Sequence, residues 1–67
     1  MKCTLRKLRL DRSGYEYRTG TYYGSGLPVY HVTPDANPSD DFTLRASTRQ
    51  KAKELIRNRW PNATFYN

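Results

Sequence analysis

Cations and tyrosines are the side chains of this sequence that could do chemistry together. Its 67 residues hold twelve lysines and arginines against six aspartates and glutamates, and six tyrosines. Lysine and arginine bind phosphates, and a tyrosine exposed on a sheet can stack on an unpaired base. The same tyrosines would also suit half-buried sheet positions without any ligand. The candidate contacts to a nucleic acid or another acidic partner are Arg6, Lys7, Arg9, Arg18, Tyr22, Tyr23, Tyr30, Arg49, Lys53 and Arg57.

The positive charge is concentrated in two separated segments. Residues 1–12 hold five cations and one carboxylate, and residues 47–60 hold the same numbers. Residues 13–46 hold two cations and four carboxylates. Such an excess attracts polyanions, although solubility alone would also account for it.

Catalytic and metal-binding patterns find little support. His31 is the only histidine, and nothing in the sequence fixes a nucleophile, a base and an orienting group within reach of one another. One cysteine and one histidine cannot supply the four ligands of a structural zinc site. Residues 24–26, Gly-Ser-Gly, precede a predicted strand rather than a helix, so they form a turn and not a phosphate loop. We therefore expect no enzymatic activity, cofactor, metal or small-molecule substrate.

A helix over residues 47–61 is expected to position part of this charge. We expect Ser47 to cap it with the help of Gln50, and Pro61 to end it. One face carries an apolar stripe at helical spacing, formed by Ala52, Leu55, Ile56 and Trp60. Another face carries a cationic ridge, formed by Arg49, Lys53 and Arg57. This ridge is either a solvated face or a track for phosphates.

The rest of the chain predicts a small sheet. Residues 2–10 fit a strand or a helix, and a turn at residues 11–14 leading into a tyrosine-rich strand favours a strand. The strands expected are 2–10, 15–19 continuing over 21–23, 27–33, 42–45 and 63–66. The sequence thus predicts one α+β domain over residues 1–67, with the order β-β-β-β-α-β. Its antiparallel sheet of three to five strands packs on the C-terminal helix.

The sequence also suggests a compartment. The N-terminus lacks the apolar run of a signal peptide, and no segment approaches the length of a membrane span. A lone cysteine favours a reducing compartment. We therefore expect a cytoplasmic protein without a membrane partner.

Residues 15–60 resemble the three-stranded-sheet-plus-helix DNA-binding domains of tyrosine recombinase arm-binding modules and plant AP2-type factors. The likeness lies in short strands around the Gly-Thr-Tyr-Tyr segment at residues 20–23, followed by one helix. It implies that the sheet enters the major groove and that Arg18, Tyr22, Tyr23 and Tyr30 contact bases or phosphates. The acidic loop at residues 34–41 and the additional first strand depart from that pattern.

Residues 42–66 are similar to a strand–helix–strand cassette of small phage proteins, some of which inhibit host RNA polymerase or CRISPR effector complexes. The matching positions are Ala46, Ser47, Ala52, Trp60 and Pro61. This resemblance implies a phage protein acting in the host cytoplasm.

Two functions follow as hypotheses. The first is a non-enzymatic protein that binds DNA or RNA through its basic, tyrosine-rich surface. The alternative is an inhibitor that docks on an acidic surface of a host nucleic-acid-processing protein.

Overall fold

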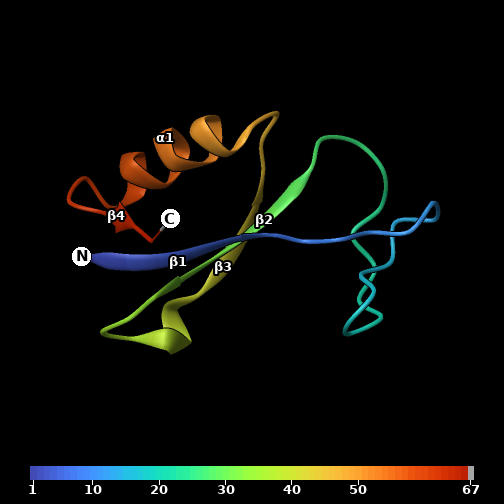
Figure 1. Cartoon of the computed structure of the whole chain (residues 1–67), viewed down its shortest axis with the longest axis horizontal. Coiled ribbons are helices and arrows are strands. Elements are labelled where there is room, and N and C mark those ends of the chain that lie inside the picture. The colour runs from blue at the N-terminus through green and yellow to red at the C-terminus, as the bar shows by residue number, and fades with distance from the viewer. Residues whose placement is uncertain (67) are drawn as a thin grey trace.

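The computed structural model describes residues 1–66, which form one sheet and one α-helix (Figure 1). In chain order the elements are β1 (Lys2–Lys7), β2 (Val29–Pro34), the 3-10 helix η1 (Pro38–Asp40), β3 (Phe42–Arg45), α1 (Arg49–Arg59) and β4 (Thr64–Phe65). No helix within residues 1–66 has the length and apolar character that crossing a bilayer requires.

The sheet has the strand order β3-β2-β1-β4. β1 pairs antiparallel with β2, and β2 pairs antiparallel with β3. β4 returns after α1 and pairs parallel with β1, only at Lys2 and Cys3. The α+β class with a C-terminal helix is therefore confirmed, and the sheet is mixed rather than wholly antiparallel.

The core lies between α1 and one face of the sheet. Alternation along the strands sends Cys3 and Leu5 of β1 and Val32 of β2 toward the helix, and each is 5% exposed or less. Ala52 and Ile56 of α1 meet them and are fully buried.

The predicted apolar stripe is confirmed in part. Trp60 is partly buried against the core, but Leu55 lies at the border of the helix face with 37% of its surface exposed. A modest rotation of the helix about its axis decides which of two adjacent apolar residues enters the core, and here it is Ile56.

The predicted cap of α1 is wrong by one residue. Thr48 is the N-cap, and its hydroxyl accepts a hydrogen bond from the backbone N–H of Lys51 at 3.1 Å. Ser47 therefore does not cap the helix, and Gln50 does not occupy the position that a capping box requires. The helix ends at Arg59, ahead of Pro61, as expected.

The predicted strand over residues 15–19 and 21–23 does not form. Residues 9–28, here called the tyrosine lobe, consist of turns with two isolated bridges, Leu10–Glu16 and Tyr15–Tyr22. The Glu16 carboxylate accepts hydrogen bonds from the backbone N–H groups of Arg18 and Thr19, the latter at 2.9 Å. These local bonds close a turn where a strand would have continued.

The tyrosine lobe extends beyond the end of the sheet that lies away from the N-terminus (Figure 1). Arg45 of β3 ties it to the sheet. Its guanidinium donates to the backbone carbonyls of Leu27 at 2.6 Å, Gly24 at 3.3 Å and Tyr23.

Candidate nucleic-acid interface

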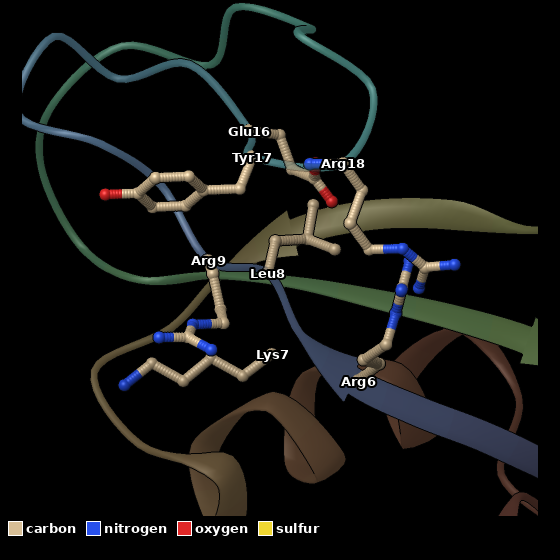
Figure 2. A pocket seen from close by; sticks show the side chains of 7 residues that line it. All are labelled: Arg6, Lys7, Leu8, Arg9, Glu16, Tyr17 and Arg18. Atoms are coloured by element: carbon tan, nitrogen blue, oxygen red, sulfur yellow. The ribbon is translucent and has the colours of Figure 1, made fainter.

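An open pocket of about 570 Å³ lies where the end of β1 meets the tyrosine lobe (Figure 2). Four of its seven lining side chains are cations, and one is an aromatic ring. The lining residues are Arg6, Lys7, Leu8, Arg9, Glu16, Tyr17 and Arg18.

The pocket exists because the outer edge of β1 is only partly covered. β4 pairs with the first two residues of β1 and leaves the rest of that edge without a neighbouring strand. Farther along the chain, the tyrosine lobe folds back and the N–H of Tyr17 donates to the carbonyl of Arg9 at 3.0 Å. The two contacts leave a gap around Arg6 and Lys7.

Charge in the pocket is unbalanced. Within residues 1–66, one ion pair joins two side chains that both carry a formal charge at neutral pH, Lys51 and Glu54, at 3.7 Å. Neither of these residues lines the pocket. Glu16 is only 4% exposed, and its carboxylate binds backbone N–H groups rather than an arginine or lysine side chain. The four pocket cations, Arg6, Lys7, Arg9 and Arg18, therefore form no ion pair within the described part of the chain.

The aromatic wall of the pocket is Tyr17, whose surface is 70% exposed. Tyr15 and Tyr22 are also exposed and lie against each other, with ring centroids 4.9 Å apart. Tyr23 is partly buried, and Tyr30 belongs to the core with 4% of its surface exposed. Because Tyr30 is buried, its side chain is not part of the surface that a ligand could contact.

Glu16 and Leu8 are pocket residues that sequence reasoning missed, and Tyr17 is one of the six tyrosines but is not among the predicted contacts. The strand predicted for residues 15–19 placed Tyr17 and Arg18 on opposite faces, because side chains alternate along a strand. The turn closed by Glu16 instead brings both side chains to one pocket. The sequence signal for this pocket was the tripeptide Glu16-Tyr17-Arg18, in which an acid that can close a turn is followed directly by an aromatic residue and a cation.

The cationic ridge of α1 packs on the neighbouring edge of the sheet. Arg49 donates to the carbonyl of Leu5 at 2.8 Å, and Arg57 donates to that of Ala63 at 3.1 Å. Lys53 and Arg57 also lie over the ring of Phe65, at 5.7 and 5.3 Å from its centroid. The ridge is therefore part of the packing between α1 and the β1–β4 edge, and not only a solvated face.

The two basic segments of the sequence meet along the outer edge of β1. The Leu5 carbonyl that binds Arg49 is followed directly by Arg6 and Lys7 of the pocket. A guanidinium has five donor N–H groups, so Arg49 keeps others for a ligand after binding one carbonyl. The edge thus carries cations from β1, the tyrosine lobe and α1.

Other chemistry is sparse. His31 Nε2 lies 2.7 Å from Asp41 Oδ2 on partly exposed side chains, away from the pocket residues. Within residues 1–66, no three His, Cys, Asp or Glu side chains gather as a metal site.

Comparison of the chain with protein-family models, curated proteins and solved structures found no match.

Proposed function

We propose that this chain is a non-enzymatic nucleic-acid-binding protein whose contact surface is the pocket at the end of β1 together with the adjoining edge. The observation that supports this proposal most strongly is the gathering of Arg6, Lys7, Arg9 and Arg18 around one opening without an ion pair. The exposed side chain of Tyr17 lines the same pocket.

Phosphate groups complement such a surface. Four unpaired cations at short range repel one another, and an array of phosphates relieves that repulsion while releasing condensed counterions. If each pocket cation contacts one phosphate, the slope of log affinity against log salt is about −2.8 for a single strand and about −3.6 for a duplex. Affinity should then fall about 50- to 150-fold between 50 and 200 mM salt.

Fluorescence anisotropy with labelled DNA and RNA at these two salt concentrations tests the proposal. The test variant replaces Arg6 and Arg18 by glutamine. The matched control replaces Lys51 and Arg59 of α1, which removes the same charge outside the pocket. We expect the pocket variant to lose more affinity than the control.

Affinity that is unchanged between the two salt concentrations would overturn the proposal. So would equal losses in the two variants, because the charge would then act without a defined site. If no nucleic acid binds, the same cations would be better explained by docking on an acidic protein surface.

A further inference from the structure

We infer that the pocket accepts an unpaired strand, with a phosphate held between Arg6 and Arg18 and a base placed against Tyr17 over Leu8. This inference rests on the proposed function and specifies the form of nucleic acid that the site takes.

The phosphate position follows from two converging guanidinium groups. Arg6 comes from β1 and Arg18 from the turn of the tyrosine lobe, and their side chains extend toward one another on one side of the pocket (Figure 2). Neither forms an ion pair within residues 1–66, since the nearby Glu16 carboxylate binds the backbone N–H groups of Arg18 and Thr19. An oxyanion with several acceptor oxygens can bind both guanidinium groups at once.

The base position follows from the opposite side of the pocket. The ring of Tyr17 is exposed, and Figure 2 shows it on the same side of the pocket as the Arg9 side chain, with Leu8 between this side and the two guanidinium groups. Leu8 is 7% exposed and forms an apolar floor. Stacking on an aromatic ring and on an arginine is indifferent to base identity, because every base has a π-face.

An unpaired strand fits this arrangement better than a duplex. In a duplex the faces of the bases are covered by their neighbours, so Tyr17 could reach only edges or the backbone. A pocket of about 570 Å³ also falls within the size range of sites that enclose a small ligand. The outward side of α1 carries Glu54 and its ion pair with Lys51, and a carboxylate there opposes entry of the helix into a groove lined by phosphates.

The test compares labelled ten-nucleotide single strands of DNA and RNA with the duplex of the same sequence, by anisotropy at both salt concentrations. We expect at least one of the two single strands to bind at least tenfold more tightly than the duplex. Tyr17→Ala should weaken that binding about 5- to 150-fold, whereas Tyr17→Phe should retain it because the stacking face remains. Replacing Arg6 and Arg18 together by glutamine should make the salt slope shallower by about 1, because the one phosphate that they hold together is lost.

The outcomes separate this inference from the proposed function. Salt-dependent binding in which the duplex equals or exceeds both single strands would overturn the inference and leave the proposed function intact. A Tyr17→Ala variant that is folded by circular dichroism and binds single strands like the parent protein would do the same. Absence of binding to every nucleic acid would overturn both.

Discussion

Replacement of Arg45 by glutamine is expected to detach the tyrosine lobe from the sheet. The guanidinium donates to three backbone carbonyls between residues 23 and 27, and one of these bonds, to Leu27, measures 2.6 Å. Glutamine is shorter and has a single amide group, so it cannot reach the same three acceptors.

The cost can be worked from the hydrogen bonds lost. A hydrogen bond to a charged group contributes about 1.5–3 kcal/mol net. The three bonds share one guanidinium and are partly exposed, so water replaces some of them and their contributions do not add fully. We therefore expect a loss of about 2–4 kcal/mol. A chain of this size has a free energy of unfolding of only about 3–10 kcal/mol, which makes the loss easy to detect.

Urea unfolding followed by circular dichroism measures the global loss, and hydrogen exchange locates it. The N–H groups of Tyr23 and Gly24 donate to the carbonyl of Gly14 at 2.8 and 3.2 Å, so they should exchange faster when the tyrosine lobe opens. Amides in the β1–β2 ladder should be affected less. Arg12→Gln is the control, because it removes a charge from the tyrosine lobe at a side chain that makes no hydrogen bond within residues 1–66.

Equal stability and exchange in the Arg45 and Arg12 variants would refute this reasoning. Arg45 would then be a surface cation like the others, and the position of the tyrosine lobe would depend on its own turns. The proposed nucleic-acid binding would supply a further readout, because Tyr17 and Arg18 belong to the tyrosine lobe. Detachment should weaken binding although no pocket residue has changed.

Three further comparisons of variants test packing, backbone geometry and protonation. Ile56→Ala should cost about 2–5 kcal/mol in urea unfolding and Leu55→Ala about 1 kcal/mol, because Ile56 is fully buried and Leu55 is 37% exposed. Gly14→Ala should cost more than Gly20→Ala: both have positive φ, +91° and +73°, but only at Gly14 would the added Cβ lie 2.5 Å from another backbone atom. Burial raises the pKa of the Cys3 thiol above its ordinary value, so its contribution to stability should be complete at neutral pH and be lost as pH rises through the raised pKa. Unfolding free energies between pH 7 and 10.5 should therefore fall more steeply for the parent protein than for Cys3→Ala, and equal slopes would contradict this assignment.

The elements predicted well are those set by local sequence. β3 occupies the predicted residues 42–45, and α1 ends ahead of Pro61, where the missing donor prevents another turn. The cap could not be chosen from sequence, because Ser47 and Thr48 are adjacent and both have a hydroxyl suited to it.

The tyrosine lobe and the pocket could not be predicted in the same way. Tyr15, Tyr17 and Thr19 alternate as in a strand, and nothing local shows that the Glu16 carboxylate will bind the N–H groups of the next turn instead. The pocket also depends on a long-range placement, in which Arg45 holds the far end of the lobe. Charge composition identified its cations, but only the fold brings Tyr17 and Glu16 to them.

The cations along β1 have a structural role that must be separated from binding. An uncovered strand edge invites pairing with another chain, and charged side chains discourage it. This role accounts for Lys7 on the open edge and for Arg49, which occupies the carbonyl of Leu5. Removing the ridge residues would therefore weaken the fold together with any binding, and such a variant could not locate a site.

Edge protection does not account for Arg18. It lies on the tyrosine lobe rather than on a strand, and its side chain extends toward Arg6, a cation, instead of toward an acid (Figure 2). Holding two guanidinium groups near each other is unfavourable unless an anion joins them, and the Glu16 carboxylate beside them binds backbone N–H groups instead of either guanidinium. Arg18→Gln should thus leave the fold as stable as before, or slightly more stable, while it weakens binding. A clear loss of stability in urea unfolding would instead make Arg18 a structural residue and remove the main support for a phosphate at this position.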